Sequence, residues 1–293
     1  MSKTSLDNDT AIQIKNLSKT FGHVKALNGI SLTINKNEVL GLLGPNGSGK
    51  TTLMRILATL TKPDSPKHKG APYTSCKVLE YDLLKERDKI KEIIGYVPQQ
   101  DALYADLSAE DNVIFFSAPY ASNGKKKNAE ELLKKVNLLH RKKDIVKTFS
   151  GGMVKRLSIT CSLAHNPSII LLDEATVGLD AQTRQDVWDI INDLKRESTV
   201  IVTTHYTPEA EQNCDRVAWI FQGEVLDLGS PAELIRKHPK AKNLDEAMSF
   251  SQQIKAAKDI KAKGATLHSS EDDSAAQKKK KRTTSQHGIN LES

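Results

Sequence analysis

Short apolar segments and amphipathic segments alternate along most of the chain. Residues 38–43, 169–172 and 199–204 are runs of mainly apolar or β-branched residues, which is typical of strands buried on both faces of a parallel sheet. After the first run, apolar residues recur at i, i+3, i+4 and i+7 and predict a helix that packs against the sheet: Leu53, Ile56, Leu57 and Leu60. This alternation favours an α/β fold with a mainly parallel sheet.

Two N-terminal strands, a helical insert and a hairpin complete the predicted elements. Residues 11–15 and 31–35 alternate apolar and polar positions, as half-buried strands do. From residue 99 to about 166 the apolar spacing is helical, so we expect a helical insert within the strand-rich core. Gln222 and Gly223 separate two further apolar segments and predict a two-residue hairpin turn.

Two segments lack such a pattern. Residues 62–80 contain three prolines and a short basic cluster, so we expect an exposed loop. From about Lys242 onward large apolar residues become rare, and the basic run at 278–282 lies among polar residues, which predicts a disordered tail. A solvated tail is preferred here over a tail that binds anionic lipid or nucleic acid.

Composition refines this picture only modestly. The 293 residues carry a net charge of +7, but residues 231–293 hold 13 Lys and Arg against 8 Asp and Glu, so the basic excess belongs mainly to the tail. The charge is therefore poor evidence for a nucleic-acid-binding core. No run reaches the roughly 18 apolar residues of a membrane-spanning helix, and the first ten residues have no signal-peptide core. Three dispersed cysteines suit a reducing cytosol.

A phosphate-binding loop directly follows the first buried strand. The pattern GxxxxGK[ST] is matched without interruption, and Thr52 after it joins the expected nucleotide-binding set: Gly44, Pro45, Asn46, Gly47, Ser48, Gly49, Lys50, Thr51 and Thr52. The glycines let backbone amides approach an anion at the positive end of the helix dipole. Lys50 is placed to bridge the terminal phosphates and Thr51 to offer its hydroxyl to Mg²⁺. The competing interpretation, a glycine-rich turn without a ligand, is disfavoured by the flanking strand and helix.

Polar side chains stand where the predicted strands end. Asp173 and Glu174 follow one buried run, Gln99 follows another and His205 follows a third. In a mainly parallel sheet such positions gather at one edge. Two carboxylates there need compensation, so we expect Asp173 beside Mg²⁺ and Glu174 as general base for the attacking water, rather than two exposed loop residues. His205 taken alone would more often be a structural histidine.

Taken in order, these features resemble the ATP-binding cassette (ABC) ATPases over residues 11–233. The matched family positions are Phe21, Gly44–Thr51, Gln99, Ser150–Gly152, Asp173, Glu174, Asp180 and His205. The resemblance implies a P-loop NTPase (RecA-like) core with a mainly parallel sheet, an antiparallel β portion and an inserted α-helical subdomain. The implied boundaries are 1–98 and 167–233 for the core, 99–166 for the helical subdomain and 234–293 for a C-terminal extension.

The resemblance also implies roles that the pattern alone does not show. Phe21 would stack on adenine, Gln99 would sense Mg²⁺ and the attacking water, and His205 would contact the γ-phosphate. The family forms a head-to-tail dimer in which the signature of one copy closes over ATP held by the other. The residues expected to act in this way are Ser150, Gly151, Gly152 and Asp180. The helix start at the signature is equally an ordinary cap on the sequence evidence alone.

Departures from the family pattern are few. Phe149 and Met153 flank the signature where Leu and Gln are commoner, and Ala175 replaces a frequent Pro. None of these changes removes a phosphate or metal ligand. In the segment 62–80, however, Glu80 occupies a usual glycine position, so we do not expect the glycine-containing hairpin of the family there.

The sequence thus predicts the ATP-binding and ATP-hydrolysing subunit of an ABC transporter of the exporter-type branch. It would use ATP and Mg²⁺, work with separate transmembrane permease subunits and with a second copy or a paralogous ATPase subunit, and lie peripherally on the cytoplasmic face of a membrane. Leu103, Tyr104 and Leu107 are the candidate permease contact; ordinary packing under the helical insert is the alternative. The cargo stays open, as does the choice between homodimer and heterodimer.

The main alternative function is a soluble ABC ATPase that acts on DNA or ribosomes. Chromosome-maintenance relatives carry a long coiled coil between the two halves of the cassette, whereas about 50 residues lie between Gln99 and Ser150. Ribosome-acting relatives usually carry two cassettes in one chain, and this chain has one. Both observations favour transport, and no nucleic-acid partner is expected. A regulatory module that binds ATP without turnover is disfavoured by the intact Glu174.

Overall fold

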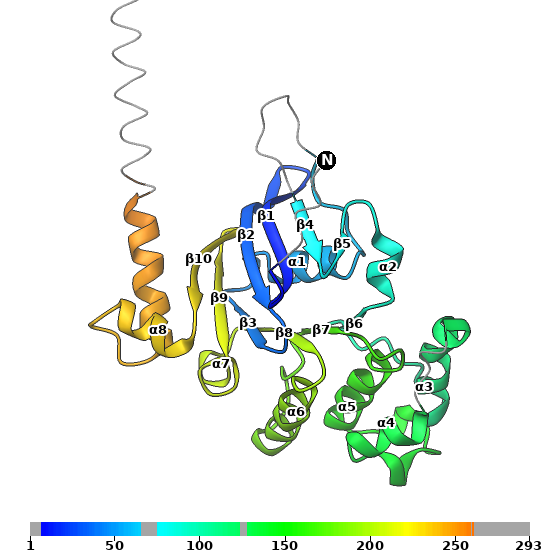
Figure 1. The fold of residues 1–293 in the computed structure, drawn as a ribbon. Helices are drawn as coiled ribbons and strands as arrows, with labels where there is room; N and C mark the ends of the chain where they lie inside the picture. Colours follow the sequence, from blue (N-terminus) through cyan, green and yellow to red (C-terminus); the bar gives the residue numbers. More distant parts are fainter. Residues whose placement is uncertain (1–6, 66–74, 124–127, 259, 261–293) are drawn as a thin grey trace, which may run out of the picture. The chain divides into compact units, whose positions relative to one another are not determined.

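The computed structural model describes residues 7–65, 75–123, 128–258 and 260. Residues up to Ala247 belong to one compact unit, and a second unit begins at Met248. The first unit holds two sheets and the helices around them (Figure 1). The described residues of the second unit continue a helix that begins at residue 244.

The larger sheet has six strands in the order β10-β9-β3-β8-β7-β6. Neighbouring strands from β9 to β6 run parallel, and only β10 at the edge pairs antiparallel, with β9. The mainly parallel sheet predicted from the buried runs is therefore confirmed. The strand bounds are Val39–Leu43 for β3, Ile94–Val97 for β6, Ile169–Asp173 for β7, Thr199–Thr204 for β8, Arg216–Phe221 for β9 and Glu224–Gly229 for β10.

The smaller sheet is antiparallel, with four strands in the order β2-β1-β4-β5. Its strands are β1 (Thr10–Phe21), β2 (Val24–Asn35), β4 (Ser75–Val78) and β5 (Tyr81–Asp82). One core cluster joins both sheets to the helix α1 (Lys50–Leu57), with fully buried side chains such as Ile12, Leu42 and Leu53. In Figure 1 this sheet and α1 lie on one side of the parallel sheet, and α5 to α7 lie on the other.

Two local expectations were wrong near this sheet. Residues 75–78 of the predicted loop form β4, which pairs with β1 and with β5, so a hairpin is present. Leu79 takes the left-handed backbone conformation (φ 50°) that a glycine usually supplies at such a turn. Leu60 is exposed rather than part of the apolar stripe, because α1 ends at Leu57 and Thr59 breaks the helix with a φ of 61°. The Lys67 to Lys69 cluster lies outside the described residues.

Helices form the segment between β6 and β7. The order is α3 (Ala109–Ser117), η1 (Ala118–Asn123), α4 (Ala129–Lys135), η2 (Leu139–Arg141), η3 (Val146–Thr148) and α5 (Gly151–Ser162). The remaining helices are α2 (Arg87–Lys91), α6 (Ala181–Leu194), α7 (Thr207–Asn213) and α8 (Pro231–Lys237). Serine caps begin α3, α5 and α8, each accepting a hydrogen bond from the backbone N–H three residues on. The domain boundaries stay predictions.

The start of the C-terminal extension is more regular than the disorder that its composition predicted. The helix α8 begins with a capping box of Ser230 and Glu233, and residues 244–258 are helical. Leu244 is fully buried, and its backbone N–H donates to the Glu211 carboxylate at 3.0 Å. This packing explains the order that composition missed. The basic run at 278–282 lies outside the described residues.

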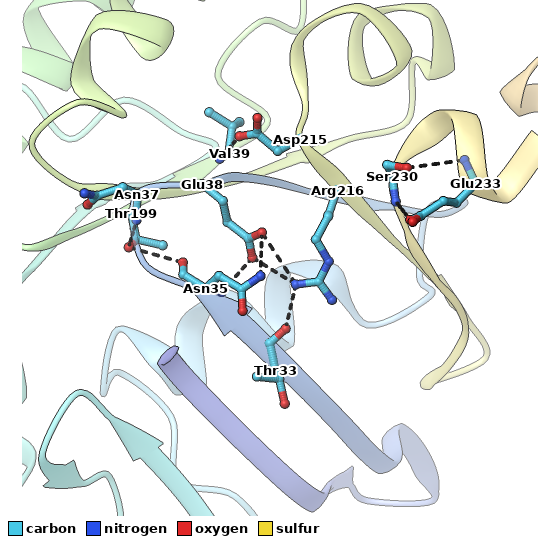
Figure 2. Close-up of polar contacts among 10 residues, drawn as sticks. All are labelled: Thr33, Asn35, Asn37, Glu38, Val39, Thr199, Asp215, Arg216, Ser230 and Glu233. Carbon is cyan, nitrogen blue, oxygen red and sulfur yellow. Dashed lines mark hydrogen bonds and ion pairs between the residues drawn. The ribbon is translucent and has the colours of Figure 1, made fainter. Parts of the chain in front are cut away.

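A polar network joins the two sheets at the end of β3 away from the phosphate loop. Figure 2 shows the buried Glu38 carboxylate accepting hydrogen bonds from the Asn35 backbone N–H at 2.7 Å and the Arg216 guanidinium at 3.2 Å. The same Arg216 nitrogen donates to the Thr33 carbonyl oxygen at 3.2 Å. The end of β2 is thereby tied to the starts of β3 and β9, which fixes the antiparallel sheet on the parallel one.

We expect Arg216→Met to lower the free energy of unfolding by about 3 kcal/mol, because it leaves the Glu38 carboxylate buried without its counter-charge. Urea unfolding without nucleotide measures this. The matched control is Lys91→Met, which removes the exposed Lys91–Asp88 pair and should change the free energy by less than about 0.5 kcal/mol. Equal effects of the two substitutions would show that the network does not hold the sheets together.

Candidate active site

The loop between β3 and α1 can be built only with glycine at two positions. Gly44 and Gly49 have φ values of 153° and 110°. A Cβ atom at Gly44 would lie 2.1 Å from the Ile220 carbonyl oxygen, and one at Gly49 would lie 2.6 Å from the Ala26 carbonyl oxygen. The loop therefore packs directly against the backbone of β9 and β2. Only a chain without side chains at these points can fold so tightly.

Hydrogen-bond donors at the start of α1 fit an anion. The helix begins after Gly49 with no side-chain cap, so its first backbone N–H groups have no capping acceptor. The Ser48 hydroxyl is buried and finds no partner among the described residues. Lys50 Nζ donates to the Gly44 and Pro45 carbonyl oxygens at 2.7 and 3.0 Å, directly beside these groups. Such a set is the ordinary binding site for phosphate at a helix start.

The Lys50 ammonium group is nearly buried and has two carboxylates nearby. Lys50 is only 5% exposed. Burial lowers the pKa of Lys50 below its ordinary value, and the nearby Glu174 and Asp173 carboxylates oppose that shift. A bound phosphate would add negative charge and favour the ammonium form further. The lysine is thus placed where an anionic ligand relieves the cost of its burial.

The Asp173 carboxylate at the end of β7 is completely buried and is held by hydroxyl groups. It accepts hydrogen bonds from Thr203 at 2.6 Å, from Thr51 at 3.3 Å and from Tyr96 at 3.5 Å. Two of the three side chains predicted to hold Mg²⁺, Thr51 and Asp173, are therefore direct neighbours, and the third is Gln99. The described part of the chain has no group of three or more His, Cys, Asp or Glu that could hold a metal ion. One carboxylate and one hydroxyl suit Mg²⁺, which takes its other ligands from phosphate and water.

Glu174 is fixed in an unusual conformation beside this carboxylate. Its φ of 51° lies in the left-handed region, and its backbone N–H donates to the Thr203 hydroxyl at 2.8 Å. Gln99 Nε2 donates to the Glu174 carboxylate at 2.7 Å. Thr203 therefore holds both members of the acidic pair, while Gln99 holds the outer one. A strained backbone at such a position is typical of functional sites.

A cavity of about 560 Å³ lies over these groups. The predicted residues that line it are Asn46, Gly47, Gly49, Lys50, Thr51, Thr52, Gln99 and Glu174. The remaining wall was missed by the sequence analysis and consists of Val24, Lys25, Ala26 and Gln222. Gln222 and Gly223 form the predicted hairpin turn, but nothing in the pattern indicated that this turn packs on the loop, where Gly223 N–H donates to the Ser48 carbonyl oxygen at 2.9 Å.

Phe21 and His205 are among the predicted residues that lie outside the lining of this cavity. Phe21 ends β1 and is 50% exposed, with the Lys19 Nζ atom 5.0 Å from its ring centroid. His205 is exposed and directly follows β8. Both are free to meet a ligand at the surface, and their roles stay predictions.

The signature residues also lie outside the cavity lining. Ser150 caps α5 and accepts from the Met153 backbone N–H at 3.3 Å. Gly152 is buried against α6, where a Cβ atom would lie 2.1 Å from Thr183 Cγ2. Asp180 caps α6, and its hydrogen bonds with the Thr183 side chain and backbone lower the pKa of its carboxyl group. Gly151, between Ser150 and Gly152 in the sequence, is exposed. The signature residues are thus not part of the cavity wall in their own chain.

Comparison with known proteins decides between the interpretations. A family model described as "ABC transporter" matches residues 27–177, just over half of the chain. The chain belongs to this family. The linearmycin resistance ATP-binding protein LnrL of Bacillus subtilis is 39% identical over 226 residues, which cover 76% of this chain and 70% of LnrL. The doxorubicin resistance ATP-binding protein DrrA of Mycobacterium tuberculosis is 36% identical over 233 residues, covering 78% and 68%.

Solved structures agree with this assignment. An ATP-binding cassette solved as a dimer in a post-hydrolysis state with ADP and Pi superposes with a TM-score of 0.64 at 28% identity, over 75% of this chain and 98% of that one. An ATP-binding subunit of an ABC transporter gives a TM-score of 0.71 over 83% and 100% at 23% identity, which supports the fold. The predicted P-loop NTPase fold, ATP-binding subunit and ATPase activity are confirmed. These relatives give no support to the alternative that acts on DNA or ribosomes.

We expect Lys50→Ala to weaken ATP binding by about tenfold or more, because a charge-assisted contact to phosphate contributes at least 1.4 kcal/mol. Titration with a fluorescent ATP analogue measures the dissociation constant, and circular dichroism checks the fold. Lys91→Ala, an exposed lysine on α2, is the control and should bind as the parent protein does. Unchanged affinity in Lys50→Ala would remove the loop from the nucleotide site.

Proposed function

We propose that this chain is the ATPase subunit of an exporter and that its catalytic centre consists of Lys50, Thr51, Asp173, Glu174 and Gln99. The observation that carries the proposal is the meeting of the loop and the acidic strand end: Thr51 donates to Asp173, and both carboxylates act on the Lys50 ammonium group. Thr51 and Asp173 are 122 positions apart in the sequence. Their meeting supports one site that binds phosphate and activates water.

Each residue then has a defined part in hydrolysis. The amides of the loop and Lys50 bind the β- and γ-phosphates and stabilise the charge that develops on them. Thr51 and Asp173 hold Mg²⁺, which neutralises the phosphate oxygens when it is bound. The Glu174 carboxylate orients the attacking water and takes its proton. Gln99, whose Nε2 atom donates to Glu174 at 2.7 Å, places that carboxylate, and its side-chain oxygen would be a further ligand for the metal.

The nucleotide site is completed by a second ATPase subunit. Ser150, Gly151, Gly152 and Asp180 lie outside the lining of the cavity in their own chain. A partner arranged head to tail would place its signature helix start over the γ-phosphate, where the N–H groups of α5 face an anion. The dimeric cassette among the structural neighbours supports this arrangement. Phe21 and His205 would then contact the adenine and the γ-phosphate from the exposed rim.

A second hollow supports a permease contact. This cavity of about 230 Å³ lies between the parallel sheet and the helices that follow β6, and Leu103, Phe116 and Tyr120 line it. Next to it Tyr104 packs edge-on against Phe115, with ring centroids 4.5 Å apart, and both are nearly half exposed. Apolar groups exposed together mark an interaction surface. We assign it to a transmembrane permease subunit, so that the chain works peripherally on the cytoplasmic face of a membrane.

The names of the relatives support a proposal for the type of cargo. LnrL and DrrA are named for resistance to linearmycin and doxorubicin. We infer that this chain powers the export of a toxic organic compound, with the permease choosing that compound. None of the described helices is long and apolar enough to cross a bilayer.

We expect Glu174→Gln to keep ATP binding and to slow hydrolysis by about 100- to 10,000-fold, since an amide cannot take the proton of water. Phosphate release measures turnover, and the fluorescent analogue measures binding. Full turnover in this variant would remove Glu174 from the role of base.

Purification from membranes in mild detergent tests the transport assignment. We expect a polytopic membrane protein to accompany the tagged chain, whereas ribosomes or DNA would contradict the proposal. Tyr104→Glu should reduce recovery of that partner severalfold, because a charge in the apolar surface must be desolvated on docking. Leu84→Glu changes an exposed apolar residue outside this surface and is the control, expected to leave recovery unchanged.

A further inference from the structure

Glu209 on α7 is a buried carboxylate that the proposed chemistry does not use. The residue is 6% exposed. Its Oε2 atom accepts a hydrogen bond from the Thr176 hydroxyl at 2.8 Å, and its Oε1 atom lies 3.0 Å from Arg184 Nε. A buried charge is retained only where its partners compensate it. Both partners of Glu209 come from the segment that follows Glu174.

The contacts of Glu209 restrain both ends of the loop 174–180. Thr176 lies two residues after Glu174 and is buried. Arg184 lies on the first turns of α6, and its Nη2 atom donates to the Leu179 carbonyl oxygen at 3.0 Å. One carboxylate thus holds the start of the loop directly and its end through an arginine. The loop has Glu174 at one end and Asp180 at the other.

The same contacts reach the segment that carries His205. Glu209 and Tyr206 both follow β8, whose end precedes His205. The Arg184 guanidinium carbon lies 5.2 Å from the centroid of the Tyr206 ring, within cation–π distance. Arg184 therefore contacts Leu179, Glu209 and Tyr206 together.

We propose that Thr176, Arg184 and Glu209 form a clamp that holds the loop 174–180 against the segment after His205, and that these three are positioning residues for the Glu174 carboxylate. The proposal rests on the proposed function, in which Glu174 is the base. Glu174 has a strained backbone, and a single hydroxyl at Thr203 receives its N–H. The clamp supplies a second restraint two residues later. Without it the carboxylate would leave the place from which it orients water.

The test compares Glu209→Gln with the parent protein in ATP hydrolysis. Gln keeps the size of the side chain and an acceptor for Thr176, but it removes the charge that Arg184 needs. We expect kcat to fall about 5- to 20-fold while KM for ATP changes by less than about twofold, because water is misplaced and the phosphate loop is intact. The kcat of Thr176→Val should fall by a similar factor. Thr176→Ser, which keeps a hydroxyl, should retain most of the activity.

The matched control is Glu211→Gln on the same helix. The Glu211 carboxylate accepts from Leu244 N–H and bonds no residue of the loop 174–180 in the described structure. This variant should hydrolyse ATP as the parent protein does. A fall in kcat as large as that of Glu209→Gln would show that any lost charge on α7 has the same effect, and would overturn the clamp.

Hydrogen–deuterium exchange without nucleotide tests the clamp separately from the proposed function. In Glu209→Gln, peptides over 174–183 should exchange faster, while peptides over the phosphate loop 44–52 keep the parent rate. Unchanged exchange over 174–183, or faster exchange in both regions, would overturn the clamp. A parent protein that does not hydrolyse ATP would contradict the proposed function, and the exchange result would still decide whether these contacts hold the loop.

Discussion

The buried Asp173 carboxylate is the constraint on which the site depends. A carboxyl group without any exposure must have its oxygens satisfied, and here hydroxyl groups from α1, β6 and β8 satisfy them. These three elements must lie at fixed positions around the end of β7, so one carboxyl group sets the spacing between the phosphate loop and the acidic strand end. Thr203 extends the restraint to the next residue by accepting from the Glu174 N–H. A metal at Asp173 would therefore meet a preorganised surface, because its hydroxyl partners are already in place.

Contacts in the rest of the fold hold in place the edge of the parallel sheet that carries the phosphate loop. At the far end of β3 the Glu38 and Arg216 pair ties the antiparallel sheet to the parallel one, and on the near side the turn at Gly223 joins the Ser48 carbonyl oxygen. The close approach of Gly44 to the Ile220 backbone belongs to the same packing. The phosphate loop thus packs against backbone at Gly44 and Gly49. A loop held in this way loses little further freedom when it binds a phosphate.

The predictions from sequence succeeded where the signal is local and failed where the cause is distant. The buried strands and the loop from Gly44 to Thr51 show short-range patterns, and these were sufficient for the parallel sheet and the meeting of Lys50 with Asp173. The hairpin at Leu79 was missed because a leucine takes a backbone conformation that propensity assigns to glycine. Gln222 was assigned to a turn correctly, but its place in the cavity wall depends on contact between β2 and the β9–β10 hairpin, which no periodicity encodes. Gly152 is a similar case. Its place at a helix start could be predicted from the sequence, but its packing against Thr183 could not.

The position of Lys50 explains how the loop can stay folded without its ligand. A buried ammonium group needs acceptors, and the Gly44 and Pro45 carbonyl oxygens supply two of them within the loop itself. A triphosphate offers stronger acceptors to the same group, so binding exchanges neutral partners for charged ones instead of ordering a disordered segment. Burial lowers the pKa of Lys50, and the Glu174 and Asp173 carboxylates oppose that shift and so favour the ammonium form. The acidic strand end therefore has two effects in one place: it is suited to hold the metal, and it favours the ammonium form of the lysine that would meet the phosphate.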